Sequence, residues 1–538
     1  MNDGSTVTVE PTEQPEAPGR LERLAVRLLQ LSAIAVVLAV STHKVFELDR
    51  FFVPKELVLH LAAVVAGLLS LRAIRRAPVL WADRLLYGYL LLSAVSVVFA
   101  TNPWAGFRAL ALSVSSIVLF RAARALSHAG LARPLLAAVA TGIVLVAITS
   151  LMQAYGVRTE LFSINRSPGG TLGNRNFVGH AAAFGLPLVL VVALRASRAV
   201  GFLSGALGVG IVTAALVLTR SRAAWLAAAV VIGVLGFSLL VAPALRRDGR
   251  TWRRLVFMAI VAVAGVAAAL LLPNSLRWRS DNPYLESIAG VTEYDEGSGR
   301  GRLIQYERSL KMAASYPILG VGPGNWPVVY PAHAPRSDRS MSRTDGGMTS
   351  NPWPSSDWIA FVSERGFVAA LAFWLALVSL AWTALRRMRA MPDRDDALMA
   401  TALLGTTAGA LVTGAFDAVL LLALPALLVW TALGALSSPL HKPDERLPRV
   451  AGTSVILLLV AISGLGASRS LAQVISMDLY ARRSDRASIE LATTLDPGNY
   501  HAHLQLARGG KGRCDHALAA RALYPNADAA KRAARDCD

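Results

Sequence analysis

The sequence predicts an all-α polytopic membrane protein with about 12 or 13 transmembrane helices. Three observations support this fold class. Of the 538 residues, 54% are hydrophobic and only 17% are charged. Apolar runs of roughly 18 to 25 residues recur along the chain, and a helix of that length can cross a bilayer core of about 30 Å. Short clusters of Lys and Arg separate many of these runs, as expected for loops on the cytoplasmic side of a membrane.

The apolar runs define the predicted transmembrane helices in order. Nine of them precede a long polar interval and four follow it. The predicted spans cover residues 24–40, 56–71, 80–100, 105–120, 134–155, 177–194, 201–218, 223–241, 255–272, 358–385, 398–413, 418–436 and 450–465.

Basic residues set the predicted orientation of these spans. Arginines precede the first span and follow every even-numbered span, which places the N-terminus and those loops in the cytoplasm. We therefore predict a disordered cytoplasmic N-terminus at 1–20, spans 1–9 within 21–272, a large outer loop at 273–356, spans 10–13 within 357–468, and an outer helical tail at 469–538.

Charge and cysteine content exclude several other classes. The formal net charge is +19, but the basic residues sit between apolar runs and form no basic stripe interleaved with aromatic residues, so we reject nucleic-acid binding. The sequence shows no ligand spacing for a metal, and we expect neither a metal nor another cofactor. Both cysteines, Cys514 and Cys537, lie in the tail, where they form either a disulfide or two unpaired thiols.

The tail is rich in alanine and has a helical pattern. Residues 487–495 and the following Asp496-Pro497-Gly498-Asn499 resemble the end of a tetratricopeptide-type helical hairpin. One such unit is too short to form a repeat array. We predict a small helical tail rather than a solenoid.

Arginines at the outer membrane boundary are the main chemical signal. Arg220 and Arg222 adjoin the start of a span on the outer side, against the usual charge bias. Arg300 and Arg302 lie in a glycine-rich part of the large loop. Arginine presents a fixed fork of donors that matches phosphate oxygens, so these residues suit a diphosphate group. The structural alternatives are a snorkelling side chain for the first pair and solvated loop charges for the second.

Two carboxylates near the start of the tenth span are candidate general bases. Asp357 follows Ser355 and Ser356, either of which is expected to cap the helix, and Glu364 lies near the same helical face. His180 and His333 are weaker candidates, because a lone histidine is more often structural than catalytic. The glycines of residues 320–325 follow no parallel-strand unit, so we predict a sharp backbone turn rather than a nucleotide site.

Several motifs together resemble the O-antigen ligase and O-antigen polymerase superfamily of bacterial inner membranes. The resemblance covers about residues 24–436, and its specificity comes from the order of the motifs and the position of the long loop. The matching pieces are Phe51-Phe52-Val53-Pro54-Lys55-Glu56, Gly170-Thr171-Leu172-Gly173-Asn174-Arg175-Asn176-Phe177, Thr219-Arg220-Ser221-Arg222-Ala223, Ser298-Gly299-Arg300-Gly301-Arg302 to Tyr306, Pro317-Ile318-Leu319-Gly320-Val321-Gly322-Pro323-Gly324-Asn325, Ser356-Asp357-Trp358 and Glu364-Arg365-Gly366.

The resemblance implies a metal-independent, inverting glycosyltransferase whose donor is a glycan on undecaprenyl diphosphate. The acceptor hydroxyl would belong to a lipid A-core, a growing polymer or a protein. Arg222 and Arg302 would hold the diphosphate, with Arg220 and Arg300 beside them. Family ligases commonly have a catalytic His-Asn pair where this chain has Ser355-Ser356, so Asp357 or Glu364 takes the base role, the arginines carry most of the rate, or activity is lost.

Two other functions fit the same sequence. A protein O-oligosaccharyltransferase of this superfamily would use the helical tail to receive a protein acceptor. A non-enzymatic transporter or scaffold for lipid-linked glycans would not need the absent histidine. Internal symmetry and paired broken helices would favour a transporter, and the sequence shows no convincing symmetry of that kind.

Overall fold

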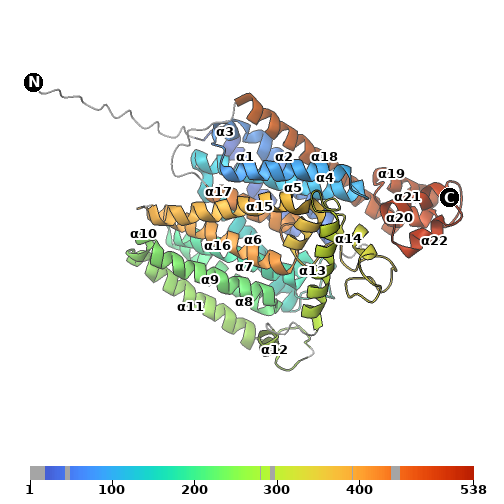
Figure 1. Ribbon diagram of the computed structural model, residues 1–538. Coiled ribbons are helices and arrows are strands. Elements are labelled where there is room, and N and C mark those ends of the chain that lie inside the picture. Colours follow the sequence, from blue (N-terminus) through green and yellow to red (C-terminus); the bar gives the residue numbers. More distant parts are fainter. Residues whose placement is uncertain are drawn as a thin grey trace, which may run out of the picture.

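The computed structural model describes residues 18–42, 49–278, 280–290, 297–390, 392–437 and 449–537. Within these ranges all regular structure is helical, apart from one isolated bridge between Met341 and Thr349. The predicted fold class, an all-α polytopic membrane protein, is therefore confirmed (Figure 1). The predicted disordered segment 1–20 lies almost entirely outside the described residues.

The helices follow one another with short connections over most of the chain. In order they are α1 Arg20–Leu38, α2 Asp49–Leu69, α3 Leu71–Arg76, α4 Trp81–Val98, α5 Pro103–Leu126, η2 Ser127–Leu131, α6 Ala132–Ala154, η3 Gly170–Leu172, α7 Arg175–Leu194, α8 Ala199–Thr219, α9 Arg222–Val241, α10 Pro243–Arg246, α11 Gly249–Leu271, α12 Pro283–Ala289, α13 Gly297–Ser315, α14 Trp326–Val329, η4 Tyr330–Ala332, α15 Asp357–Ala390, α16 Arg394–Phe416, α17 Ala423–Leu436, α18 Arg449–Arg482, α19 Arg486–Leu495, α20 Tyr500–Leu506, α21 Arg513–Leu523 and α22 Asp528–Ala534.

Ten helical runs among the described residues are long and apolar enough to cross a membrane. One of them, Pro103–Ala154, holds both α5 and α6. The charged first turns of α1 and the short length of α17, 14 residues, keep these two helices outside that group. Each predicted span nevertheless falls on a helix of the structure.

Ion pairs join the helix ends on one side of the bundle. Arg121 and Arg124, near the end of α5, pair with Asp83 at the start of α4. Arg394, at the start of α16, pairs with Asp248 directly before α11 at 2.6 Å. Figure 1 shows α10 at this side and helices α19–α22 at the opposite one. The arginine-rich loops therefore gather at one end of the bundle, as the alternating pattern predicts.

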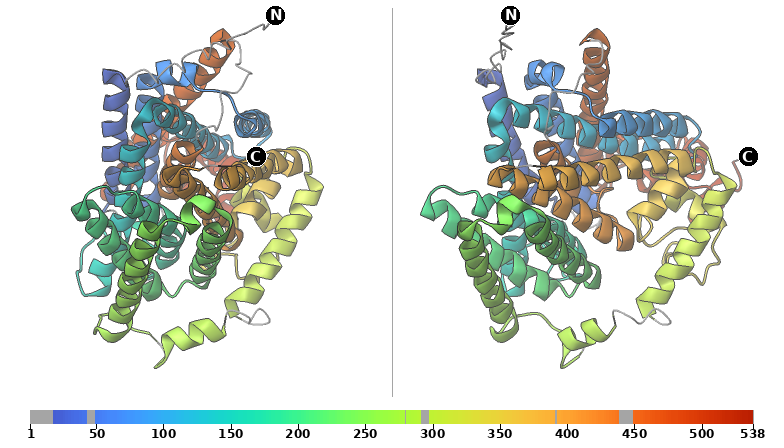
Figure 2. Two further views of the ribbon diagram at one scale, coloured as in Figure 1. Left: turned by 90° about the vertical axis from the view of Figure 1, so that its left-hand side faces the viewer. Right: turned by 60° about the vertical axis from the view of Figure 1, so that its left-hand side comes forward.

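Helix α7 runs through the centre of the bundle. In its most apolar stretch, 94% of the residues are buried, whereas the corresponding value for α11 is 11%. Helix α16 packs closely on α7 because Gly409 faces Phe184, where an added Cβ would lie 2.9 Å from the backbone. Helix α11 is left at the periphery, and the segment with α12 and α13 continues from its end (Figure 2).

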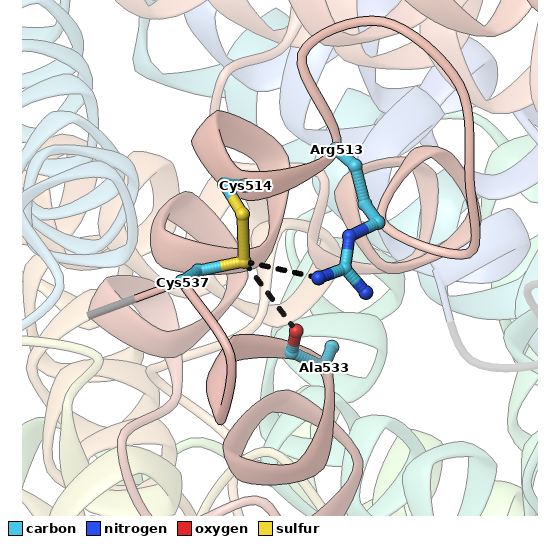
Figure 3. Close-up of a disulfide and its surroundings, with 4 residues drawn as sticks. All are labelled: Arg513, Cys514, Ala533 and Cys537. Carbon is cyan, nitrogen blue, oxygen red and sulfur yellow. Dashed lines mark hydrogen bonds between the residues drawn. A yellow bond between two sulfur atoms is a disulfide. The ribbon is translucent and has the colours of Figure 1, made fainter.

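The tail packs on the end of the bundle opposite the arginine-rich loops, which we call the outer end. Helix α18 extends to Arg482, and α19–α22 pack in sequence after it. Cys514 and Cys537 form a disulfide between the start of α21 and the residues after α22, beside Arg513 and Ala533 (Figure 3). The tail is fixed to the loop after α14 because the Asp528 amide donates to the Gly346 carbonyl at 2.8 Å. The tetratricopeptide assignment stays a prediction.

Candidate anion-binding cavity

A cavity of about 220 Å³ opens among α7, α9, α12, α13 and the end of α16. It lies at the outer end of the bundle, where α7 and α9 begin. We call it the arginine cavity. Its polar lining consists of Arg175, Asn176, His180, Arg220, Ser221, Arg222, Ser287 and Arg302, and its other lining residues are Ala223, Leu226, Gly290, Gly299 and Phe416.

The turn between α8 and α9 places two of these arginines. Arg220 has φ +52°, and among the described residues other than glycine it alone has positive φ. Such a conformation is unfavourable for a side chain and is often retained at functional sites. Arg220 donates to the Ser287 hydroxyl at 2.9 Å and to the Glu286 carboxylate at 3.2 Å, both on α12. The turn therefore connects the bundle to the large loop.

Arg222 is the first residue of α9 and reaches the end of α12. Its guanidinium donates to the Gly290 carbonyl. Gly290 permits this approach, because a Cβ there would lie 2.6 Å from the Arg222 Cζ. Among the described residues, Arg222 has no carboxylate partner. Most of its donor fork therefore remains free for an anion.

Arg302 enters the cavity from α13. It is half-buried and has neither a hydrogen bond nor an ion pair with the rest of the described chain. An arginine held in a cavity without an acidic partner pays for desolvation without an offsetting charge. Such a group is suited to contact an anionic ligand.

Arg175 is a fourth arginine of the cavity. It begins α7, whose N-cap Asn174 accepts a hydrogen bond from the Asn176 amide. The indole of Trp278 lies 4.9 Å from the Arg175 Cζ and 4.7 Å from the Arg220 Cζ, so one ring supports both cations. Gly173 precedes this cap in a left-handed conformation and packs against the Phe51 ring, so two of the motifs contact each other.

The cavity carries a strong excess of positive charge. Four guanidinium groups line it, and no carboxylate of the described residues does. Glu286 contacts Arg220 from outside the lining and is 62% exposed, so it offsets one charge only in part. Convergent arginines of this kind can bind two phosphate groups through several charge-assisted hydrogen bonds.

The predicted diphosphate residues separate into two groups. Arg220, Arg222 and Arg302 meet at the cavity, whereas Arg300 is exposed and does not line it. The neighbouring Gly299 does line the cavity. Helical geometry explains the difference, because Arg300 and Arg302 are two residues apart on α13 and therefore point in different directions.

Asp357 lies outside the cavity lining and is fully buried. Its carboxylate accepts hydrogen bonds from the Val419 amide at 2.9 Å and the Leu420 amide at 2.8 Å. These amides belong to the non-helical segment between α16 and α17, which has no intrahelical partners for them. Asp357 thus joins α15 to that segment.

Glu364 also lies outside the cavity lining and is buried. It accepts hydrogen bonds from the Gly324 amide at 2.9 Å and the Trp326 amide at 3.3 Å, and it contacts Arg365 at 3.1 Å. Gly320, Gly322 and Gly324 all have positive φ, which confirms the predicted sharp turn over residues 320–325. Glu364 therefore fastens this turn to α15.

The two serines before α15 also make hydrogen bonds that hold neighbouring segments in place. The Ser356 hydroxyl accepts a hydrogen bond from the Trp358 amide at 3.2 Å, which confirms it as the helix cap. The Ser355 amide donates to the Gln305 side chain, and its carbonyl accepts from the Tyr306 hydroxyl. Ser355 therefore fixes α13 against the start of α15.

Sequence reasoning gave no role to Arg175, Asn176 or Trp278, and it ranked His180 low. One signal was available for Arg175. It begins an apolar helix on the outer side, as Arg222 does, against the usual distribution of charge. Nothing in the chain order indicates that Trp278, about a hundred residues later, would support it.

A second polar cavity of about 160 Å³ lies between the bundle and the tail. We call it the tail cavity. Arg108 on α5 pairs there with Glu56 at 2.7 Å and Asp49 at 3.2 Å, and Arg469 on α18 pairs with Asp496. Burial raises the pKa of Tyr500 and of Tyr524 to about 12, so both phenols stay protonated at neutral pH.

Comparison with known proteins adds one family. Residues 207–374 match the family model described as O-antigen ligase. The match covers less than half of the chain and confirms the predicted resemblance to the O-antigen ligase and polymerase superfamily. It contains Arg220, Arg222 and Arg302, whereas Arg175 and His180 lie before it. No curated protein matches the chain.

Proposed function

We propose that this chain, which carries an O-antigen ligase domain, is a metal-independent, inverting glycosyltransferase of bacterial inner membranes. Its donor is a glycan on undecaprenyl diphosphate, and its acceptor is a hydroxyl of a lipid A-core, a growing polymer or a protein. The observation that carries this proposal is the arginine cavity. Four arginines converge there at the outer boundary of a membrane bundle, with no carboxylate among the described lining residues.

The arginines suit the leaving group of such a reaction. The acceptor oxygen forms a bond to the anomeric carbon, and the bond from that carbon to the diphosphate oxygen breaks. The electron pair of the broken bond stays on the diphosphate, which gains negative charge as it leaves. Arg222 and Arg302 can stabilise that charge, because neither has a carboxylate partner among the described residues, while Arg175 and Arg220 lie beside the Trp278 ring.

The position of the cavity fits a lipid-linked donor. Leu226 and Phe416 form apolar parts of its lining, and α9, which contributes Leu226, is largely exposed toward the surrounding membrane. A diphosphate bound to the arginines would leave its polyprenyl chain beside such apolar helices. The periplasmic side is supported by the arginine clusters at the opposite end of the bundle and by the tail disulfide, since disulfides persist in oxidising compartments.

A protein O-oligosaccharyltransferase is the second candidate. The tail is packed against the loop that follows α13, through Asp528 to Gly346 and Asn526 to Val328. A domain fixed in this place is suited to present a protein acceptor near the large loop. In a non-enzymatic transporter or scaffold, the same arginines would bind the donor without bond cleavage, so transfer assays separate this alternative from both enzymes.

The proposal gives Asp357 and Glu364 supporting roles. Each carboxylate already accepts two backbone hydrogen bonds and holds a non-helical segment in place. A base must reach the acceptor proton within hydrogen-bond distance or through one water. Neither carboxylate lines the cavity, so we assign them to the frame of the site.

The decisive experiment compares Arg222→Ala and Arg302→Ala with Arg300→Ala as the matched control. Binding of undecaprenyl diphosphate is measured with purified protein, and transfer is followed in host membranes as conversion of lipid-linked glycan to acceptor-linked glycan. We expect the first two variants to lose about 10²-fold or more in transfer, with weaker lipid binding, while the control keeps wild-type values. Wild-type transfer by both cavity variants would refute the proposal.

A further inference from the structure

His180 is a buried imidazole in the wall of the arginine cavity. It lies on α7, is 1% exposed and lines the cavity near Arg302. Its Nδ1 is enclosed and has no hydrogen-bond partner among the described residues. Buried polar atoms are nearly always paired, so an unpaired ring nitrogen beside a cavity calls for an explanation.

The orientation of the ring leaves one nitrogen for a ligand. Because Nδ1 is enclosed while the residue lines the cavity, the Nε2 edge is the one that can meet a bound molecule. The tautomer with its proton on Nδ1 leaves the lone pair on Nε2. The surroundings of the ring are closely packed, because 94% of the residues in the most apolar stretch of α7 are buried.

Two charged groups of opposite sign lie near the ring. Arg302 on α13 and Asp417 at the end of α16 are the charged groups that act on it. Asp417 can favour an imidazolium through its charge, and among the described residues it makes no hydrogen bond to the ring. A diphosphate bound to Arg302 would offset the opposing positive charge of that arginine. The base would then work best when the donor is in place.

We infer that His180 is the general base that deprotonates the acceptor hydroxyl, from the α7 wall of the cavity. The inference rests on the proposed glycosyl transfer. It fills the role that the serines before α15 leave open, and it uses a residue of the membrane bundle instead of the large loop. His333, the histidine of that loop, contacts the Val329 carbonyl and does not line the cavity.

The step balances without another reactant. The acceptor O–H proton moves to Nε2 of His180 as the acceptor oxygen bonds to the anomeric carbon. The diphosphate departs with the electron pair of its carbon–oxygen bond. Imidazolium then returns the proton to water or to the departing diphosphate. No oxidant or reductant takes part.

The experiment compares His180→Ala and His180→Gln with His333→Ala as the matched control. Glutamine fills the space of the ring but cannot take up a proton. Transfer is measured in host membranes with the donor present there, and binding is measured with undecaprenyl diphosphate. We expect both His180 variants to lose about 10²-fold to 10⁴-fold in transfer, with lipid affinity unchanged. Added imidazole should restore part of the activity of His180→Ala, and the control should match the wild type.

Three results would overturn the inference. The first is wild-type transfer by His180→Gln. The second is a loss in His180→Ala that imidazole leaves unchanged, since this marks the ring as packing alone. The third is a loss of lipid binding in both variants. These outcomes leave the proposed function standing, because that proposal depends on Arg222 and Arg302. If Arg222→Ala and Arg302→Ala both transfer the glycan as well as the wild type does, the proposed function and this inference fail together.

Discussion

The arginine cavity and the tail cavity lie toward the same outer end of the molecule, yet their arginines differ in whether they have carboxylate partners. In the tail cavity Arg108 and Arg469 each have carboxylate partners. In the arginine cavity Arg222 and Arg302 have none among the described residues, and only Arg220 contacts a carboxylate. A paired arginine connects two helices and has fewer donors left for a ligand. An unpaired one in a cavity keeps more of them.

This difference separates structural arginines from candidate binding residues. Arg108 joins α5 to α2, and Arg469 joins α18 to the turn before α20 while its guanidinium lies 4.3 Å from the Trp104 ring. Both pairs secure the tail side of the bundle. Charge at the outer end is therefore informative only when its partners are known. The following predictions test the contrast, from the largest expected effect to the smallest.

Arg108→Ala should destabilise the protein and leave donor binding unchanged. Glu56 is buried and would lose its partner, so we expect the free energy of unfolding to fall by about 2 kcal/mol. This is less than the loss for a fully buried pair, because the Arg108 side chain is 30% exposed. Thermal unfolding in detergent measures the loss, and undecaprenyl diphosphate binding serves as the internal control. If the variant kept full stability and bound the lipid more weakly, Arg108 would be a binding residue and the contrast between the two cavities would fail.

Asn176→Asp should weaken donor binding and leave the stability of the protein unchanged. The change is nearly isosteric and adds one negative charge to the lining of the arginine cavity. Asp is favoured in the first turn of a helix, so stability should be kept. We expect undecaprenyl diphosphate to bind about tenfold more weakly, or about 1.4 kcal/mol. Unchanged affinity would show that Asn176 lies away from the bound phosphates. Asn274→Asp, on the same side but outside the lining, is the matched control.

The tail should lose stability in mild acid, while the arginine cavity keeps its charge. His503 and His516 face each other with their Nδ1 atoms 3.1 Å apart, and burial is the main cause that lowers the pKa of each. A lowered folded pKa means that the stabilisation is complete above the ordinary histidine pKa of about 6.5 and is lost as the pH falls below it. Proteolysis of the tail should therefore become faster as the pH falls from about 7 to about 5.5.

His516→Gln is the control for this pH effect. The variant removes one titrating ring and should flatten the change in proteolysis over the same range. If the wild-type tail is equally resistant at both pH values, the histidine pair has no part in its stability. The arginines of the arginine cavity keep their positive charge across this range, because arginine stays protonated throughout.

Hydropathy was sufficient to locate the long apolar helices, because a run that crosses a bilayer must have a minimum length whatever its neighbours are. Arg220 and Arg222 were also found from the chain alone, since their position opposes the usual charge bias, and Arg302 was found from its place in the glycine-rich part of the large loop. Asp357 and Glu364 were chosen for their chemistry and their shared helical face. Their partners are amides of Val419, Leu420, Gly324 and Trp326, which are distant in sequence. Spacing along one helix carries no information about such contacts.

The sequence by itself determined the helical membrane fold, the glycine turn at residues 320–325 and most of the arginines that line the arginine cavity. These features follow from local properties: apolar length, charge bias and backbone freedom. Only the tertiary structure decided that Arg175 joins the cavity while Arg300 does not, and that His180 lies in its wall while the predicted carboxylates support the frame. Those outcomes depend on which distant groups fill the hydrogen bonds of each side chain, and that is settled when the helices pack.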